Sequence, residues 1–278
     1  MRELKVLAHL TKFGVKSLLR NQRALVFTIL FPIVLLVLFN SIFAHGDQTT
    51  TLAHGLELDE QAYFLAGILA YTIMLTAFST MAIGLTAQRE SGTLKRLRGT
   101  PLPPWVFMAA QVVRAVLLIA FMTVAMLLIG HFAYDVHFPG DTFGGFVVYL
   151  IVGTATMCIL GIALTSVLPT AESAATIAPF TAVLLSFISG VFIPVQQLPN
   201  WLEEIGRVFP LAHLAEGLQT TLAPGATGSG LSGENLGVLG LWAVGGLVLA
   251  PIILRRMARR ESGSVVAERR VRAVQRIS

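Results

Sequence analysis

The chain has 278 residues, of which 55% are hydrophobic and only 13% are charged, and its formal net charge is +5. A soluble protein of this length carries about 25% charged residues, so the composition excludes an ordinary soluble protein and predicts an integral membrane protein. The single cysteine, Cys158, excludes a disulfide within the chain.

Residues 2–23 predict an amphipathic helix. Its cations gather on one side: Lys5, Lys12, Lys16, Arg20 and Arg23. A separate apolar stripe, at about 100° per residue, holds Leu4, Leu7, Ala8, Thr11, Val15, Leu18 and Leu19. Such a helix lies in the membrane interface with its cations among anionic lipid headgroups. Residues 1–23 are therefore expected to form a cytosolic interfacial helix, either as a topology anchor or as a lever that moves with a cytosolic partner.

Six segments are long and apolar enough to cross a membrane, because a spanning helix needs about 20 apolar residues. They cover residues 24–43, 63–86, 105–133, 146–168, 174–194 and 236–254. The first is longer than the apolar region of a cleaved signal peptide. We expect an all-α membrane domain over residues 24–254 and a basic cytoplasmic tail over 255–278.

The cations alternate between the two sides of these spans. Residues 1–23 hold six Lys or Arg, residues 87–104 hold four and residues 255–278 hold eight, whereas the loops 44–62 and 134–145 hold none. The positive-inside rule therefore predicts cytoplasmic termini. Sixteen arginines against four lysines favour a GC-rich bacterial genome, so we expect a multi-pass protein of the bacterial cytoplasmic membrane.

The most charged loop follows the second span. Residues 88–98 predict a short cytosolic helix, with Glu90 near its positive end and Lys95, Arg96 and Arg98 near its negative end. Gly92 costs about 1 kcal/mol inside a helix, which a close contact or a bend of the chain would explain. An ordinary positive-inside loop remains the alternative to a docking element.

Prolines divide residues 194–222 into pieces too short to span. Asn200 is the expected cap of one helix, which has Glu203 and Glu204 facing away from an apolar face formed by Trp201, Leu202, Ile205, Val208 and Phe209. A second short helix over residues 211–221 carries His213 and Glu216. An amphipathic surface hairpin and a hairpin that dips into the outer leaflet both fit this pattern.

Few ionisable residues fall within the spans. Arg114 lies in the third span, where it either reaches the lipid phosphates or pairs with Glu90 or with Glu172 of the short cytosolic turn. Ser189 with His213 is the one weak pair for a membrane serine protease. No HExxH metal motif is present, no metal is expected, and no basic-aromatic pattern indicates nucleic-acid binding.

Two stretches carry a family resemblance. "QRESGTLKRLRGTPLPPW", residues 88–105, resembles the cytoplasmic loop between the second and third spans of ABC-2 type transporter permeases. "SGVFIPVQQLPNWLEEIGRVFPLAHLAEGLQ", residues 189–219, resembles that family's exit from the fifth span and its outer re-entrant hairpin. The likeness is greatest to the short, daunorubicin-type drug exporter permeases. Gln88 and Lys95 depart from the family, which has acidic residues there.

The resemblance implies roles for both stretches. It implies the ABC-2, or type V exporter, fold, with the charged loop as a coupling helix for an ATPase. The matching positions in the loop are Arg89, Glu90, Gly92, Thr93, Leu94, Thr100 and Pro101, to which we add the neighbouring cations Lys95 and Arg96. The implied outer gate comprises Ser189, Gly190, Phe192, Pro194, Leu198, Pro199, Trp201, Pro210 and His213.

The chain carries no ATPase motif of its own. A P-loop needs Gly directly before its Lys, and the four lysines follow Leu, Thr, Val and Leu. The resemblance implies two cytosolic ATPase subunits, which bind ATP and Mg²⁺, beneath a pair of permeases that is a homodimer or a pair with a related permease. We expect export of an amphiphilic drug, antibiotic or lipid; export of a polysaccharide or lipid-linked glycan, and an ATP-independent carrier or channel, are the alternatives.

Overall fold

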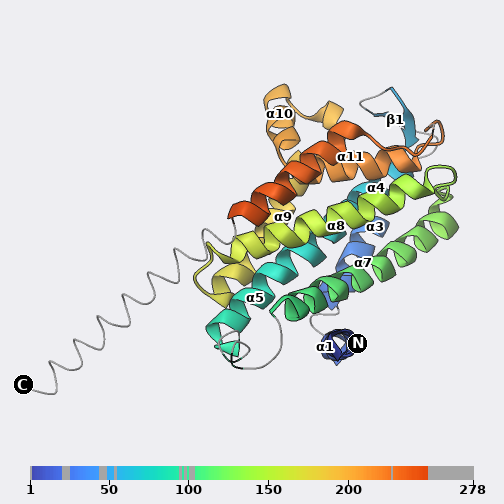
Figure 1. The fold of residues 1–278 in the computed structure, drawn as a ribbon. Coiled ribbons are helices and arrows are strands. Elements are labelled where there is room, and N and C mark those ends of the chain that lie inside the picture. The colour runs from blue at the N-terminus through green and yellow to red at the C-terminus, as the bar shows by residue number, and fades with distance from the viewer. Residues whose placement is uncertain are drawn as a thin grey trace, which may run out of the picture.

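The computed structural model describes residues 2–20, 26–43, 49–52, 55–93, 96, 99, 104–226 and 228–249. Within them, long helices run side by side as a bundle, and a small sheet and a short helical hairpin cover one end (Figure 1). A helix in lipid satisfies its backbone polar groups with its own hydrogen bonds. Its side chains are apolar because they contact hydrocarbon or neighbouring helices.

The first helix, α1 (Arg2–Arg20), packs against the bundle helix α7 (Pro104–Tyr134). Figure 1 views α1 along its axis while the bundle helices run across the picture, so α1 lies across the end of the bundle. Thr11 is buried, whereas Lys5, Lys12 and Lys16 are exposed. A helix is therefore present where the sequence predicted one, although Ala8 of the predicted apolar stripe is exposed. Its location in a membrane interface stays a prediction, and Arg23 lies outside the described part of the chain.

Among the described residues, four helical stretches are long and apolar enough to cross a membrane, at the places of the expected second to fifth spans. They cover Glu60–Glu90, Val106–Tyr134, Phe143–Thr165 and Ala171–Ile188. Two shorter apolar helices, Thr28–Ile42 and Gly233–Leu249, lie where the first and sixth spans were expected. Residues 24–25 and 250–254 of those two predicted spans lie outside the described residues.

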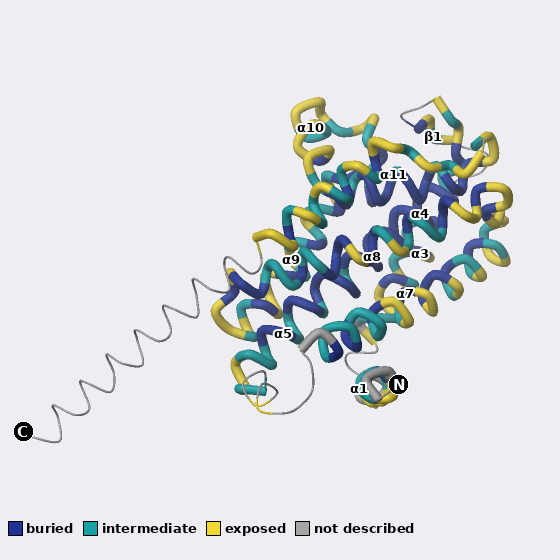
Figure 2. The backbone as a smooth tube through the Cα atoms, viewed as in Figure 1, coloured by how far each residue is buried: buried dark blue, intermediate teal, exposed yellow. Residues whose placement is uncertain are grey.

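The second span is the central helix of the bundle. It is continuous through α4 (Glu60–Ile73), a π-helical segment η2 (Met74–Ser79) and α5 (Thr80–Glu90), and α4 is buried from Ala62 to Ile73 (Figure 2). Small residues permit this close packing. A Cβ on Gly161 of α8 (Phe143–Thr165), for example, would lie 2.5 Å from the carbonyl oxygen of Phe78.

The purely helical expectation was wrong for the outer loop before α4. β1 (Thr49–Thr51) and β2 (Glu57–Asp59) form an antiparallel pair in which Thr49 lies opposite Asp59. The turn between them uses Gly55 at φ +74°, a conformation that glycine adopts without strain. The strands are three residues long and carry no apolar alternation, so the pattern that usually reveals a strand was missing.

The hairpin that was expected on the outer side begins earlier than predicted, and residues 189–222 are called the outer hairpin below. α9 (Ala171–Ile188) ends before residue 194 because Gly190, at φ +69°, turns the chain. A short 3-10 turn η3 (Val195–Gln197) and the helices α10 (Asn200–Val208) and α11 (Pro210–Leu222) follow. The predicted cap was wrong: Pro199 precedes the helix and its carbonyl accepts the N–H groups of Leu202 and Glu203, while Asn200 is already helical.

The single helix expected over residues 88–98 was also wrong. α5 ends at Glu90, and Gly92 then adopts φ +70°. A Cβ on Gly92 would meet no atom within 4 Å. A bend, and not a close contact, therefore explains the glycine. Leu94, Lys95, Arg98, Thr100 and Pro101 lie outside the described residues, so the form of the loop beyond the bend is not described at those positions.

Candidate functional site

The candidate residues gather at the two ends of one continuous helix. Glu60–Glu90 has 31 residues, so its ends are about 45 Å apart at 1.5 Å per residue. The charged loop follows the Glu90 end, and the outer hairpin packs against the Glu60 end, where α11 contacts α4. Figure 1 places α5 and α10 at opposite ends of the bundle.

At the Glu90 end of α5, Arg89 donates hydrogen bonds to the last carbonyl of α8 and to two carbonyls of the turn that follows it. Its Nη1 donates to the carbonyl of Thr165 at 2.8 Å, and its Nη2 donates to those of Pro169, at 3.0 Å, and Leu168. The last carbonyls of a helix lack intrahelical partners and carry its partial negative charge. A guanidinium offers a planar set of donors that satisfies several of them at once.

Glu90 binds the start of the next helix. Its Oε2 accepts a hydrogen bond from the N–H of Ala171, the first residue of α9, at 2.9 Å. Thr170 and Ser173 complete this helix end as a reciprocal capping box. A carboxylate is favourable at a helix N-terminus, as a cation is at a C-terminus. We call the two side chains and their backbone partners in residues 165–171 the α5 clamp.

The loop beyond the clamp is exposed at Ser91, Arg96 and Gly99 and half-buried at Gly92 and Thr93. Ser91 and Thr93 join their hydroxyl groups at 2.9 Å, and Arg96 donates to the carbonyl of Ser91 at 3.0 Å. Arg96 is exposed, and its bond therefore leaves the cation at the surface.

Arg114 does not pair with either predicted glutamate. Within the described part of the chain, no ion pair joins it to Glu90, which belongs to the clamp, or to Glu172, which is exposed in the first turn of α9. Arg114 instead lies against α1: a Cβ on Gly14 would be 3.1 Å from its Cδ atom. The only charged side chain expected within a span therefore packs at the junction of α1 and α7.

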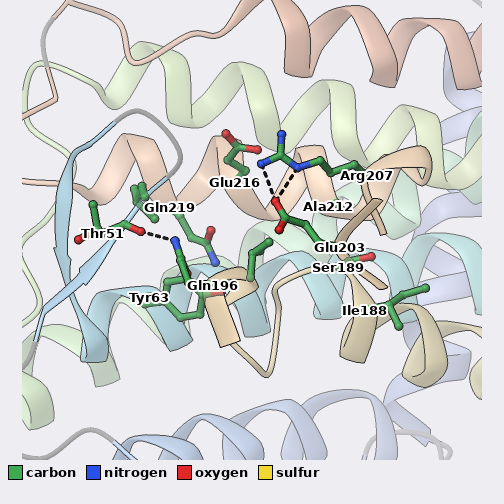
Figure 3. Close-up of a pocket in the computed structure, with 12 residues that line it drawn as sticks. Thr51, Tyr63, Ile188, Ser189, Gln196, Glu203, Arg207, Ala212, Glu216 and Gln219 are labelled. Carbon is green, nitrogen blue, oxygen red and sulfur yellow. Dashed lines mark hydrogen bonds and ion pairs between the residues drawn. The ribbon is translucent and has the colours of Figure 1, made fainter. Parts of the chain in front are cut away.

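At the opposite end, the outer hairpin encloses a cavity of about 260 Å³ (Figure 3). The Tyr63 hydroxyl and the side-chain amide of Gln219 both donate to the carbonyl of Gly190, at 2.5 and 3.1 Å. Gln196 bonds the carbonyl of Thr51 in β1. Polar side chains that line the remaining wall are Ser189, Glu203, Arg207 and Glu216. The cavity thus joins segments from three separate parts of the sequence.

The apolar face of α10 is exposed, and its charged face lines the cavity. Trp201, Ile205 and Val208 are 63%, 44% and 60% exposed. Glu203, which was expected to face away from the apolar side chains of this helix, lines the cavity and pairs with Arg207 at 2.9 Å. Gly206 is the close contact: a Cβ there would lie 1.9 Å from the carbonyl oxygen of Ile188. An exposed apolar face above a membrane bundle fits contact with lipid.

The other predicted gate residues are distributed along the exit of α9. Phe192 is buried and packs its ring against Phe39, Tyr71 and Phe187 at 5.2, 5.4 and 5.2 Å between centroids. The three prolines lie at the starts of elements: Pro194 precedes η3, Pro199 precedes α10 and Pro210 begins α11. Leu198 is half-buried.

His213 is a structural residue and not part of a serine–histidine pair. It is 5% exposed, its Nε2 lies 2.8 Å from the carbonyl of Arg207, and its Nδ1 lies 2.8 Å from the side-chain oxygen of Asn235. The Ser189 hydroxyl has no hydrogen-bond partner among the described residues. Both ring nitrogens of His213 are therefore occupied by groups other than Ser189, which removes the weak protease alternative.

The model of the family described as ABC-2 type transporter matches residues 5–223 of this chain. The chain belongs to the ABC-2 type transporter family. The resemblance inferred from the two motifs is thereby confirmed, and with it a multi-pass membrane protein. Family membership implies ABC ATPase subunits as partners.

Two relatives of the chain are distant from it in sequence. The chain is 22% identical over 204 residues to the putative transport permease YvfS of Bacillus subtilis (strain 168), covering 73% of this chain and 79% of YvfS. It is 24% identical over 160 residues to the probable multidrug ABC transporter permease YbhR of Escherichia coli (strain K12), covering 57% of this chain. That second match spans 43% of YbhR, less than half of its length.

Sequence reasoning missed several residues of this ABC-2 protein that the structure brings to the two ends. Tyr63, Gln196 and Gln219 line the outer cavity, and the carbonyls of residues 165–169 receive Arg89. Their partners lie 29 to 145 positions away in the sequence. A polar residue at the end of an apolar span was the available signal, but it does not name the partner.

Proposed function

We propose that the chain is the permease subunit of an ATP-driven exporter in a bacterial cytoplasmic membrane. The observation that carries this proposal is the family match over residues 5–223. The structure adds a physical basis, because one continuous helix, Glu60–Glu90, connects a charged loop at one end with a cavity lined by both polar and apolar side chains at the other. A permease needs such a connection if work done on one side of the membrane is to open the other side.

The energy comes from another polypeptide in this proposal. No lysine of the chain follows a glycine, so the chain lacks the P-loop that holds nucleotide phosphates. Two cytosolic ATPase subunits bind ATP and Mg²⁺ and dock beneath a pair of permeases, either two copies of this chain or this chain with a related one. The chain itself is then a transport subunit and not an enzyme.

The cargo in this proposal is an amphiphilic molecule. The exposed apolar side of α10 and the polar wall of the cavity lie on the same short helix, which suits a molecule with both apolar and polar parts. The relative YbhR is described as a probable multidrug ABC transporter permease, which agrees with such a cargo. A polysaccharide or lipid-linked glycan is the second candidate within the family, and vesicle assays with each cargo class separate the two.

The orientation in this proposal has both termini and the charged loop in the cytoplasm. It rests on the alternation of cations along the sequence. The test introduces one cysteine at exposed Ser91 or at exposed Asn200, in a chain with the buried Cys158 changed to alanine. An impermeant maleimide added to intact cells is expected to label position 200 and to spare position 91 until the cells are opened; the reverse pattern would refute this orientation.

The test of function is recruitment of an ATPase. The tagged chain is co-expressed with the ATPase encoded beside it, and the membrane complex is purified and assayed for ATP hydrolysis. The proposal predicts a stable complex whose hydrolysis rises when amphiphilic compounds are added. Transport that persists without any ATPase, and follows a proton or sodium gradient, would instead support an ATP-independent carrier.

A further inference from the structure

We propose that Arg89 and Glu90 are positioning residues that link the cytosolic loop to α8 and α9, and that their role is within the permease. This inference rests on the proposed function, because it concerns how a partner's movement reaches the membrane helices. It changes the role implied by the family resemblance, in which both residues belong to the surface that docks the ATPase.

Both side chains form hydrogen bonds to other parts of the same chain. Arg89 donates to three carbonyls of residues 165–169, and Glu90 accepts the N–H of Ala171. These partners lie 76 to 81 positions away in the sequence. Charge-assisted hydrogen bonds of this kind are about twice as strong as neutral ones. The clamp therefore resists movement of α5 relative to the α8–α9 turn.

The two contacts have opposite polarity. Arg89 meets the negative end of α8, and Glu90 meets the positive end of α9. Reversing either charge would oppose a helix dipole. Two adjacent residues of opposite charge thus match the two helix ends that a tight turn brings together, and the match fixes the register of α5 against both spans.

The clamp lies between the loop and the helix that leads to the outer cavity. The bend at Gly92 begins directly after it. From Ala171, α9 continues for 18 residues to Ile188, whose carbonyl packs against Gly206 of α10. A displacement of the loop that moves the clamp is thereby passed along α9 to the helix that carries Glu203 and Arg207 of the cavity wall.

The test measures this movement without knowing the cargo. Spin labels are placed on cysteines at the exposed positions 49 in β1 and 205 in α10, with Cys158 changed to alanine, and the distance between them is measured in the complex with its ATPase, with and without ATP. The variants are Arg89→Lys, Glu90→Ala and Glu90→Gln. Glu172→Gln is the control, because it removes a carboxylate from the same turn of α9 without touching the clamp.

We expect Glu90→Ala and Arg89→Lys to keep the ATPase bound and to reduce the fraction of permeases that change distance by roughly tenfold, the size of a usual coupling between sites. Glu90→Gln should retain most of the change, because its amide oxygen still accepts the Ala171 N–H. Hydrogen exchange at that N–H should rise by about fivefold in Glu90→Ala, the value of one net hydrogen bond.

Three results would overturn the inference. Loss of the ATPase from the Glu90→Ala complex would make Glu90 a docking contact. An equal defect in Glu90→Gln and Glu90→Ala would show that the hydrogen bond from the Ala171 N–H, which glutamine also accepts, does not carry the movement. A full ATP-driven change in Glu90→Ala and Arg89→Lys would show that the clamp carries no movement. If the wild-type complex itself shows no change with ATP, the proposed function fails together with this inference.

Discussion

The hydroxyl of Tyr63 donates a hydrogen bond of 2.5 Å to the carbonyl of Gly190 and so joins the outer end of α4 to the turn that ends α9. Gln219 of α11 donates to the same carbonyl at 3.1 Å. Tyr63 is 2% exposed, and Gly190 holds φ +69°. One carbonyl oxygen, with two lone pairs, thus holds three elements of the outer end in a fixed arrangement.

The two hydrogen bonds that the Gly190 carbonyl accepts predict that substitutions of their donors have non-additive effects. Tyr63→Phe and Gln219→Leu should each lower the free energy of unfolding by about 1 kcal/mol, because the carbonyl keeps one partner in either single variant. The double variant leaves the carbonyl buried without a partner, which adds about 1–3 kcal/mol. Thermal unfolding of the detergent-solubilised chain measures the three values. Simple additivity would contradict the shared acceptor.

The contact between α9 and α10 predicts that Gly206 tolerates no side chain. Gly206→Ala places a Cβ 1.9 Å from the carbonyl oxygen of Ile188, so the backbones have to separate at a cost of about 1–3 kcal/mol. Gly237→Ala is the matched control, since a Cβ there meets nothing within 4 Å and gains up to about 1 kcal/mol of helix propensity. Equal melting temperatures for the two variants would contradict the close contact.

The bend after the clamp predicts a graded response at Gly92. A left-handed conformation costs a residue with a Cβ about 1–2 kcal/mol, and asparagine less than other residues. No neighbouring atom adds to this cost. The yield of co-purified ATPase should therefore fall in the order Gly92→Asn, Gly92→Ala, Gly92→Val. Wild-type yield for Gly92→Val would mean that the bend is not needed for docking.

The network around His213 predicts partial rescue by a second substitution. His213→Phe leaves the Arg207 carbonyl and the Asn235 side chain without their partner, and each such buried group costs about 1–3 kcal/mol. Adding Asn235→Leu removes one of these unpaired groups and should recover part of the lost stability. Urea unfolding followed by tryptophan fluorescence compares the two variants. A further loss in the double variant would contradict this network.

The sequence predicted the membrane helices well because hydrocarbon thickness sets their length directly. The second to fifth spans were placed to within a few residues at most ends, and the apolar character of the helices Thr28–Ile42 and Gly233–Leu249 was also recognised. Boundaries failed where backbone conformation decides them: Gly92 ended a helix and Gly190 ended another, and both have positive φ. A glycine in a sequence does not reveal whether it bends the chain or admits a neighbour.

The site was predicted less completely than the fold. The motif identified Arg89 and Glu90, but their partners are backbone atoms of residues 165–171, which any sequence would offer. Likewise, His213 was recognised as unusual, while its partner Asn235 lies on a helix 22 positions away. Hydrogen bonds to the backbone leave no pattern in side-chain types, so they become visible only in three dimensions.

The most direct test of the account is transport by the purified proteins in inside-out proteoliposomes with no ion gradient. The chain with its ATPase should accumulate a fluorescent amphiphile when ATP and Mg²⁺ are added, and neither the chain alone nor a complex with an ATPase mutated at its P-loop lysine should do so. Accumulation by the chain alone, or equal accumulation with the mutated ATPase, would contradict a permease driven by a separate ATPase.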